Sequence, residues 1–383
     1  MLNWNLRYTG GVNEVVRNLF DLTEPFLQHR PMVLERDWNQ TDLKVTVENG
    51  RRSAVGSWPA PWDQRRGLRY LATFLVRLPG AMRQLRRLLD AEGVDTVHVH
   101  FPGLEALIWP TIRRACNRPF RLILSFHGLD LKFALHSTGI ERLCWARLLD
   151  SSDHIVVCSE PLRRSLAERF PRIQTKIRVI GNGVDTAKIE EAAAAPVLAD
   201  TPPSYVFSAA TYERKKGIDV LMRAFDMIAD RHRDLSLVVA GRYEDVTFVE
   251  LDRLRTSLPS AGRIVLMRDL PHSTTLGLMA RARCFVLASR EEPFGIALLE
   301  AGALATPAVA SDVCGCLAFF EAGTDLRVVP ADDPAGLAEA IHGALEDPEG
   351  ARRMAVRMQA KVRARLEWSS IAGAYSELGR ALR

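Results

Sequence analysis

The sequence lacks long hydrophobic runs, repeats and low-complexity tracts. Nowhere among its 383 residues do about 18 apolar residues follow one another, which is the length that a membrane-spanning helix needs. The first residues contain no basic segment followed by the apolar stretch of a secretory leader. The missing repeats and biased tracts exclude solenoid and disordered proteins. We therefore expect a cytoplasmic globular protein that is neither secreted nor membrane-spanning.

Cysteine is also scarce. The six cysteines are scattered through apolar or strand-like segments, and their one close pair, Cys314 and Cys316, does not have the spacing of a zinc knuckle. We interpret all six as reduced thiols in the core. The cysteines therefore predict no metal site.

The charge is unevenly distributed. The formal net charge is +5, but residues 1–195 hold 28 Lys and Arg against 21 Asp and Glu, whereas the remainder holds 23 against 25. Much of the excess lies between Arg51 and Arg87, where arginines interleave with aromatic and leucine residues. This pattern is typical of a basic amphipathic helix on an anionic membrane, and equally of an arginine-rich solvated face on a helix whose apolar side packs on the core. No nucleic-acid-binding module accompanies the charge, so we expect no nucleic acid partner.

Short apolar runs alternate with stretches of helical period, which is the pattern of β-α-β units around parallel sheets. A first strand within Met1–Leu6 is short, or the sequence starts inside it. Further strands in the first half are expected at Thr96–His100, Arg121–Phe126 and His154–Cys158. A second sheet is predicted by five more strands, at Tyr205–Ala209, Ser236–Ala240, Ile264–Met267, Cys284–Ala288 and Ala308–Ala310. Helices are expected among them, near Gly217–Arg231, Thr247–Leu258, Thr274–Arg281, Ile296–Ala305 and Pro334–Leu345.

This double alternation predicts an α/β protein with two Rossmann-like, doubly wound parallel-sheet domains, since 383 residues exceed the usual size of one domain. The segment Glu190–Pro203 is rich in Ala and Pro and marks the boundary. We place the first domain at residues 1–190 and the second at 191–365. A C-terminal helix at 366–383 is expected to return to the first domain.

Candidate site residues in the first domain follow predicted strands. Gly10 and Gly11 precede a helical pattern, where backbone N–H groups can approach a phosphate, although a simple tight turn explains them equally well. His127 ends a strand at the carboxyl edge of the sheet, where open α/β domains bind their ligands. His98 and His100 end the neighbouring strand in the same way. A histidine at such a place is often only structural.

Three consecutive cations, Arg214, Lys215 and Lys216, precede the first helix of the second domain. They would form a phosphate clamp if their side chains turned toward a ligand. A solvated run of charges is the usual alternative.

The strongest local signal is the segment from Glu292 to Glu300, which follows the fourth strand of the second domain. Chain-breaking residues separate the first carboxylate from a helix whose start offers the backbone N–H groups of Phe294, Gly295 and Ile296. Glu300 lies one turn beyond Ile296 on the same helix face. Two such carboxylates can accept hydrogen bonds from the vicinal hydroxyls of a sugar and a ribose. A salt bridge that neutralises Glu300 is the alternative.

The order of these elements resembles that of glycosyltransferase family 4, the group 1 glycosyltransferases. The resemblance covers nearly the whole chain and implies the GT-B architecture, in which two Rossmann-like domains face a central cleft. The matching pieces are Gly10-Gly11, His98-Val99-His100, Ser125-Phe126-His127-Gly128, Val156–Glu160, Asn182-Gly183-Val184-Asp185, Lys216-Gly217, and Glu292 with Glu300.

The resemblance also implies roles for individual residues. Glu300 would hold the ribose hydroxyls of a donor nucleotide, and Glu292 would contact hydroxyls of the transferred sugar. Lys216 would bind the diphosphate. His127 would lie beside the donor sugar, which makes His127 and Glu292 the expected catalytic residues.

The diphosphate site implied by the resemblance needs no metal ion or cofactor, because protein cations and helix dipoles neutralise the phosphates. Backbone N–H groups at Gly10–Gly11 and Phe294–Ile296 would take part. The family usually has an arginine at the position of Thr211. Arg214 or Lys215 would replace it as a diphosphate ligand, or the donor is held more weakly.

The implied reaction transfers a hexose-type sugar from a nucleoside diphosphate sugar to an acceptor hydroxyl, with retention at the anomeric carbon. The basic first half suits a saccharide or lipid-linked saccharide acceptor at the inner face of the cytoplasmic membrane, in cell-surface polysaccharide or glycolipid synthesis. A sugar-nucleotide epimerase and a phosphorylase are alternatives within the fold. A degenerate glycosyltransferase-like protein that only binds a nucleotide or a partner is the alternative from another class, and Thr211 is its best support.

Overall fold

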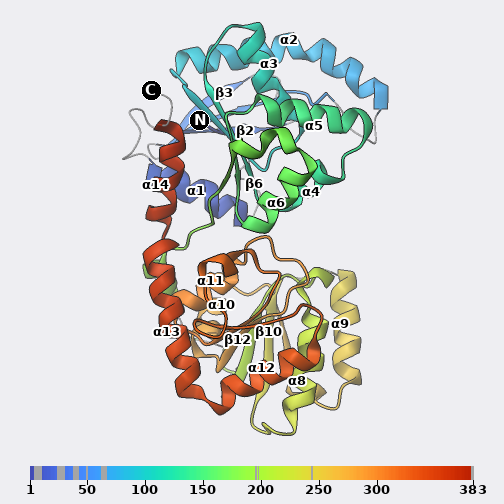
Figure 1. Cartoon of the computed structure of the whole chain (residues 1–383), viewed down its shortest axis with the longest axis vertical. Coiled ribbons are helices and arrows are strands. Elements are labelled where there is room, and N and C mark those ends of the chain that lie inside the picture. The colour runs from blue at the N-terminus through green and yellow to red at the C-terminus, as the bar shows by residue number, and fades with distance from the viewer. Residues whose placement is uncertain are drawn as a thin grey trace. The chain divides into compact units, whose positions relative to one another are not determined.

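A computed structural model describes residues 1–3, 11–23, 31–37, 43–48, 51–61, 67–194, 196, 198–242 and 245–380. The chain forms two compact units (Figure 1). Unit 1 consists of Met1–Gly181 with Trp368–Arg383, and unit 2 consists of Asn182–Glu367. Each is an α/β unit built on a largely parallel sheet, which confirms the predicted fold class. Within the described residues, no helix combines the length and hydrophobicity that crossing a bilayer requires.

The sheet of unit 1 has the strand order β3-β4-β2-β1-β5-β6-β7-β8, and every neighbouring pair is parallel except β3 with β4. The three strands predicted in its centre are present, with the third ending one residue earlier than expected. The bounds are β1 Leu2–Asn3, β2 Met32–Arg36, β3 Lys44–Glu48, β4 Arg51–Gly56, β5 Thr96–His100, β6 Arg121–Phe126, β7 His154–Val157 and β8 Ile177–Val179.

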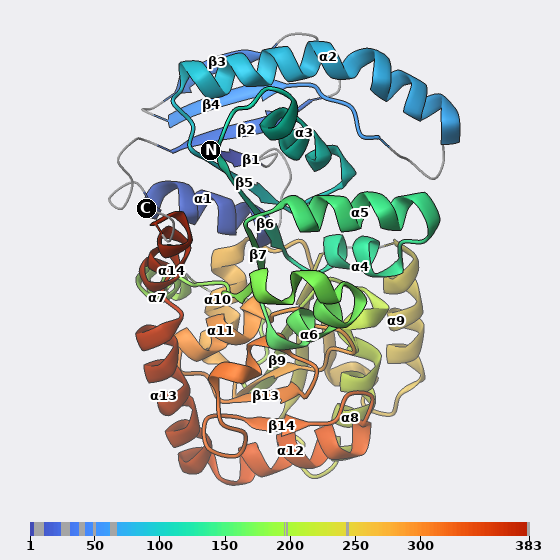
Figure 2. The same cartoon turned by 45° about the horizontal axis from the view of Figure 1, so that its top comes forward.

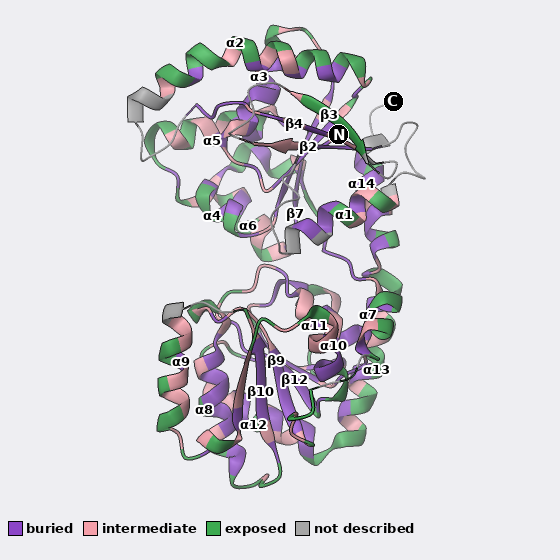
Figure 3. Cartoon of the chain, turned by 180° about the vertical axis from the view of Figure 1, so that it is seen from behind, coloured by how far each residue is buried: buried purple, intermediate pink, exposed green. Residues whose placement is uncertain are grey.

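Helices cover both faces of the unit 1 sheet because its central strands are apolar on both sides. Leu122 and Leu124 of β6 join the core beneath one set of helices, whereas Ile123 joins a separate cluster formed with α1 and α14. The helices are α1 Gly11–Thr23, α2 Gly67–Ala91, α3 Ile108–Ala115, α4 Leu129–His136, α5 Gly139–Ser151, α6 Glu160–Arg169 and α14 Trp368–Arg380, with short 3₁₀ turns at Leu104–Leu107 and Pro171–Lys176. The buried central strands are visible between these helices in Figure 3.

The basic segment from Arg51 to Arg87 is not one amphipathic helix, which corrects that expectation. Its first part is the strand β4, because the segment Arg51–Gly56 pairs with both β2 and β3. The helix α2 begins only at Gly67, and it buries Phe74 and Leu85 on the core while its arginines at 77, 83, 86 and 87 are exposed. The apolar side of α2 therefore packs on the core, and the exposed arginines form a basic side that faces the solvent.

The sheet of unit 2 is wholly parallel, with the order β11-β10-β9-β12-β13-β14. Figure 2 labels three of these strands, β9, β13 and β14. All five predicted strands are present, and the sixth, β14, is only Arg327–Val329. The others are β9 Tyr205–Ala209, β10 Ser236–Gly241, β11 Ile264–Arg268, β12 Cys284–Leu287 and β13 Ala308–Ser311.

The five helices predicted for unit 2 are present as α8 to α12, whereas α7 was not predicted and overlaps the expected boundary segment Glu190–Pro203. The helices α8 and α12 share one core with the sheet, and α10 packs on α7 and α11. The bounds are α7 Thr186–Ala193, α8 Ile218–Ala229, α9 Asp245–Ser257, α10 His272–Arg281, α11 Ile296–Ala303, α12 Pro334–Glu346 and α13 Pro348–Arg365, with 3₁₀ turns at Arg214–Lys216, Ala261–Arg263 and Gly315–Phe319.

The chain passes between the units at two places. The first lies between Gly181 and Asn182, ahead of the expected boundary at 190, because α7 packs against α10 of unit 2. The second lies between Glu367 and Trp368, where the chain leaves unit 2 after α13. The following helix, α14, then packs beside α1 in unit 1.

Candidate functional site

A lysine and a glutamate meet at the carboxyl edge of the unit 2 sheet. Lys216 follows β9 and Glu292 follows β12, and these strands are hydrogen-bonded neighbours, so the turns after them lie together. Lys216 Nζ is 2.8 Å from Glu292 Oε2, and the two side chains are only 17% and 11% exposed. Ser289 Oγ donates to the same carboxylate oxygen at 3.2 Å. The pair is thus a largely desolvated ion pair at the ligand-binding edge of the unit.

Backbone contacts lock the two turns together. The N–H groups of Arg290 and Glu291 donate to the carbonyl of Lys215 at 2.7 and 3.2 Å. Gly217 has φ +63°, and a Cβ there would lie 1.9 Å from the carbonyl oxygen of Ala288. Only glycine permits this close approach, and it fixes the residue before it, Lys216, against the second turn.

The three consecutive cations have different surroundings. They form the 3₁₀ turn Arg214–Lys216, in which successive side chains point about 120° apart. Lys216 reaches Glu292, whereas Lys215 pairs with Glu213 and Arg214 is exposed. Thr211, at the family's usual arginine position, donates to Glu213 at 2.7 Å. Lys216 alone of the three therefore faces the carboxylate.

Arg290, which was not predicted as a site residue, stabilises the carboxyl edge of the unit 2 sheet. Arg290 donates to both oxygens of Asp219 at 2.7 and 2.8 Å and also pairs with Asp332. Burial alone would raise the pKa of Asp219, but the bidentate arginine lowers that pKa below its usual value. The partner residues lie far apart in the sequence, so no local pattern could reveal the clamp.

The start of α11 is held by the segment Cys314-Gly315-Cys316. The N–H groups of Gly315 and Cys316 donate to the carbonyls of Glu292 and Phe294 at 3.1 and 2.8 Å. Gly295 has φ +100°, and a Cβ there would lie 2.4 Å from Cys314 Sγ. Since α11 begins at Ile296, its first N–H groups have no intrahelical partner.

Glu300 has a histidine partner. Its side chain is 13% exposed, and His272 Nε2 lies 2.8 Å from Glu300 Oε1. His272 begins α10, immediately after the loop that follows β11, and is 67% exposed. The salt-bridge alternative for Glu300 thus finds its partner in an exposed imidazole. His272 was not predicted from the sequence, although it follows β11 just as the predicted site residues follow their strands.

The predicted histidines of unit 1 form a buried cluster at the end of β5 and β6. His100 Nδ1 is 3.2 Å from His127 Nε2, and His98 Nε2 is 2.6 Å from Ser125 Oγ. The rings of His98 and His100 have centroids 4.0 Å apart, and Tyr375 of α14 lies 5.3 Å from the first. The strand-end histidines therefore do come together.

Burial keeps these imidazoles neutral. It lowers the pKa of His98 to about 3 and that of His127 to about 4, and it lowers the pKa of His100 well below the ordinary value. Asp130 is fully buried and accepts hydrogen bonds from the N–H groups of His127 and Gly128, which fixes the turn after β6. Burial raises the pKa of Asp130 to about 7. Asp130 is a positioning residue that the sequence analysis did not identify.

The structure describes only one residue of the predicted glycine pair Gly10-Gly11. Gly10 lies outside the described residues, and Gly11 is the first residue of α1. Gly11 therefore lies within the helix that it was expected to precede.

Two doubly wound units, one carrying a lysine, two glutamates and a helix start at its carboxyl edge, define a GT-B glycosyltransferase. Family models match most of the chain: the one described as Glycosyltransferase Family 4 matches residues 9–188, and the one described as Glycosyl transferases group 1 matches residues 189–361. The chain belongs to this glycosyltransferase family.

Curated relatives include enzymes with different acceptors. The glycogen synthase of Mycobacterium tuberculosis is 30% identical over 232 residues, which are 60% of this chain and 55% of that protein. The phosphatidyl-myo-inositol mannosyltransferase of Mycolicibacterium smegmatis is 27% identical over 300 residues, 76% of this chain and 72% of that protein. The chain thus spans little more than half the length of the glycogen synthase that it matches.

Solved structures share the fold over the full length. The sucrose-phosphate synthase from Thermosynechococcus elongatus has a TM-score of 0.73 at 21% identity, covering 100% of this chain and 98% of that one. Anabaena HepE in complex with UDP and glucose has a TM-score of 0.72 at 17% identity, covering 100% and 99%. At these identities the likeness establishes the GT-B fold.

Proposed function

We propose that the protein transfers a sugar from a nucleoside diphosphate sugar to an acceptor hydroxyl, with retention at the anomeric carbon and without a metal ion. The observation that carries the proposal is the contact of Lys216 with Glu292 at 2.8 Å, beside the start of α11. A desolvated ammonium next to free helix N–H groups is a site for a diphosphate. HepE, with the same fold, is a complex with UDP and glucose, which supports this ligand class.

In this proposal the donor diphosphate replaces Glu292 as the partner of Lys216. Glu292 neutralises Lys216 in the absence of donor, and the diphosphate then takes the ammonium and the N–H groups of α11. Glu292 is released to accept hydrogen bonds from the transferred sugar. As the sugar–phosphate bond breaks, the leaving diphosphate gains charge, and the fixed ammonium and helix start stabilise it.

Glu300 is proposed to hold the ribose of the donor. Its carboxylate has two oxygens, and the vicinal 2′ and 3′ hydroxyls of a ribose can donate to both. His272 holds one oxygen at 2.8 Å and thereby limits rotation of the carboxylate. A ribose whose 2′ and 3′ hydroxyls are both free matches such an acceptor.

His127 is proposed to contact a hydroxyl of the donor sugar. Its ring is neutral, and within the described residues its buried Nδ1 has no hydrogen-bond partner. A neutral imidazole can exchange a hydrogen bond with a hydroxyl without adding charge beside an oxocarbenium-like transition state. We propose same-face attack by the acceptor, with an oxygen of the leaving phosphate as the base.

Thermal unfolding with a panel of nucleotide sugars tests the proposal. Wild-type protein is screened with UDP-, GDP- and ADP-sugars, with and without EDTA, beside Glu300→Ala. Donor at 100 times its dissociation constant should stabilise the wild type by about 2.7 kcal/mol in EDTA, and the variant should lose the response. No response from folded wild type would favour the degenerate, binding-only alternative. Release of free sugar without any acceptor would favour an epimerase.

A lipid-linked acceptor at an anionic membrane is proposed from the outer side of α2. That side exposes Leu75 and Val76 by 60% and 81%, next to the exposed arginines of the same helix. A relative named for phosphatidyl-myo-inositol mannosyl transfer supports this acceptor class. Binding to vesicles containing anionic lipid should be lost at high salt and weakened by Arg83→Glu. Absence of binding, or binding that salt does not release, would contradict an electrostatic attachment.

A further inference from the structure

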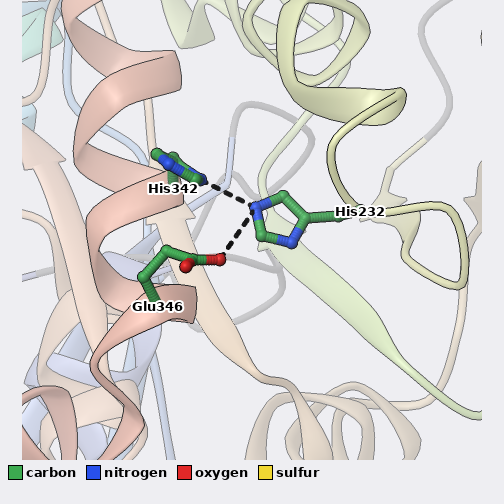
Figure 4. Close-up of side chains that lie close together, drawn as sticks. All are labelled: His232, His342 and Glu346. Atoms are coloured by element: carbon green, nitrogen blue, oxygen red, sulfur yellow. Dashed lines mark hydrogen bonds and ion pairs between the residues drawn. The ribbon is translucent and has the colours of Figure 1, made fainter.

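Two histidines and a glutamate of unit 2 converge outside the site described above. His232 Nε2 lies 2.9 Å from His342 Nδ1 and 4.0 Å from Glu346 Oε1 (Figure 4). The ligand atoms of all three residues lie within 4.8 Å of one another. His232 and His342 are 110 residues apart in the sequence, so the fold alone brings them together.

The backbone holds these side chains in place. His232 lies in the turn between α8 and β10, where its N–H donates to Ile228 and its carbonyl accepts from Leu235 and from Arg263 at 2.9 Å. His342 and Glu346 are one turn apart on α12, which places them on the same side of the helix. Because α8 and α12 share one core, the three ligands belong to one packed body.

Two helix ends favour a cation at the cluster, whereas the nearby Arg231 and Arg283 oppose one. Both α8 and α12 end at this cluster, at Ala229 and Glu346, and helix C-termini favour positive charge. The neighbouring Arg231 is paired with Glu339 at 3.3 Å. Glu346 is 64% exposed and His232 only 15%, so the carboxylate side is open to solvent. A water could complete the coordination there.

The cluster is separate from the donor site. His232 precedes β10 and therefore lies at the amino edge of the parallel strands, where α8 and α12 end. Lys216 and Glu292 follow β9 and β12 at the opposite, carboxyl edge. An ion bound at the cluster would not touch the proposed donor.

We infer that His232, His342 and Glu346 form a binding site for a borderline divalent transition-metal ion, with Zn²⁺ the best match. Two imidazoles, one carboxylate and a water are a donor set that Zn²⁺ takes. Tetrahedral bonds of about 2.0–2.1 Å place two ligand nitrogens about 3.4 Å apart, so the present 2.9 Å needs a shift of a few tenths of an ångström. One imidazole changes tautomer so that both nitrogens offer a lone pair. The ion ties the end of α12 to the turn after α8.

Calorimetric titration of the metal-free full chain with ZnCl₂ tests this site. Wild type is compared with His342→Ala, with Glu346→Gln, and with Glu349→Gln as a control for an exposed acid outside the cluster. We expect one Zn²⁺ per chain in wild type and control. His342→Ala should weaken binding at least about 100-fold, since loss of an outer-shell partner alone costs 10- to 100-fold. Glu346→Gln, at an exposed position, should fold normally and bind about 10-fold more weakly.

Absorption of the Co²⁺-loaded protein identifies the ligands. Nitrogen and oxygen ligation gives the visible bands of tetrahedral cobalt without thiolate charge transfer, and Mg²⁺ should not compete because it prefers six oxygen ligands. The inference is overturned if folded wild type binds no Zn²⁺, if folded His342→Ala keeps wild-type affinity, or if thiolate charge transfer appears. The last result would assign the metal to cysteines.

Discussion

The carboxyl edges of the two sheets both carry polar side chains, but these side chains differ in charge. Both units place polar side chains at the ends of buried parallel strands, where water is largely excluded. In unit 1 the groups are imidazoles whose pKa values burial has lowered, so that His98 and His127 are neutral. In unit 2 the groups form ion pairs, Lys216 with Glu292 and Arg290 with Asp219. A fold thus fixes where a site lies, whereas side-chain chemistry fixes its charge.

This difference fits the two halves of a nucleotide sugar under the proposed function. A diphosphate needs cations that are already paired and desolvated, which unit 2 supplies. An uncharged sugar needs hydrogen-bonding groups without net charge, which unit 1 supplies. Each change described below tests this difference in charge between unit 1 and unit 2.

Removing the cation of unit 2 should have the largest effect. Lys216→Met should lower the rate of sugar transfer by about 100- to 1,000-fold, because one preorganised group that stabilises developing charge contributes about that much. Lys215→Met is the matched control, since that exposed lysine pairs with Glu213 and should change the rate by less than about threefold. Steady-state rates with saturating acceptor measure both. Equal losses would show that the cations act as a group.

Filling the glycine turn should destabilise unit 2. Gly217→Ala puts a Cβ 1.9 Å from the carbonyl oxygen of Ala288 at φ +63°, and we expect about 3 kcal/mol loss in the free energy of unfolding. Gly262→Ala is the control, because a Cβ there meets nothing within 4 Å. Urea unfolding of the two variants gives the comparison. Similar stabilities would mean that the turn relaxes freely.

Acid should weaken unit 1 more than unit 2. The pKa values of His98 and His127 are about 3 and about 4 in the fold against 6.5 unfolded, so below pH 6.5 the unfolded chain binds more protons. Between pH 7 and pH 5 each histidine costs about 2 kcal/mol of stability. Asp130 opposes this, since its pKa of about 7 exceeds the unfolded value, and its protonation returns about 2 kcal/mol.

A net loss of about 2 kcal/mol is therefore expected in unit 1, and the lowered pKa of His100 adds to it. Hydrogen exchange at pH 7 and pH 5, corrected for the intrinsic rate and resolved by peptide, separates the units. The faster opening should be confined to the peptides of β5 and β6. Uniform changes across both sheets would contradict a buried neutral cluster as the cause.

The smallest effect is expected at Asp130. Its carboxyl is easily protonated, so Asp130→Asn should cost about 1 kcal/mol or less at pH 6, while Oδ1 keeps the bonds from His127, Gly128 and Leu131. Asp219→Asn in unit 2 should cost about 2 kcal/mol, because it leaves Arg290 with a weakened partner. Thermal unfolding of the two variants tests the order. A larger loss at Asp130 would mean that this carboxyl is charged in the fold.

Local sequence patterns predicted the central strands of both sheets well. Strands such as Arg121–Phe126 and Cys284–Leu287 are short apolar runs bounded by turn signals, and both were expected. The strands β2, β3 and β4 were not, because β3 is exposed and alternates without a core face. The pairing of β3 with β4 is local, since only Asn49-Gly50 separates them in the sequence, and that residue pair is a hairpin signal that was missed. The three-residue β14 is too short to show a period.

Residues that belong to a family motif were predicted as site residues, but the contacts between them were not predicted. Lys216 and Glu292 were assigned to different parts of a ligand, yet the fold makes them partners across 76 residues. His272 and Asp130 were not predicted, because their importance comes from Glu300 and from the N–H groups around His127. Only a folded chain shows which charges neutralise one another.

The affinity for a free nucleoside diphosphate tests the contrast between the units most directly. Calorimetry in EDTA compares wild type with Lys216→Met and His127→Ala, using whichever of UDP, GDP or ADP stabilises the wild type. The account predicts that Lys216→Met weakens binding by at least about 10-fold, since loss of a charge-assisted contact costs about 1.5–3 kcal/mol, while His127→Ala leaves it within about twofold. Loss of affinity in His127→Ala with none in Lys216→Met would contradict the assignment of the diphosphate to unit 2.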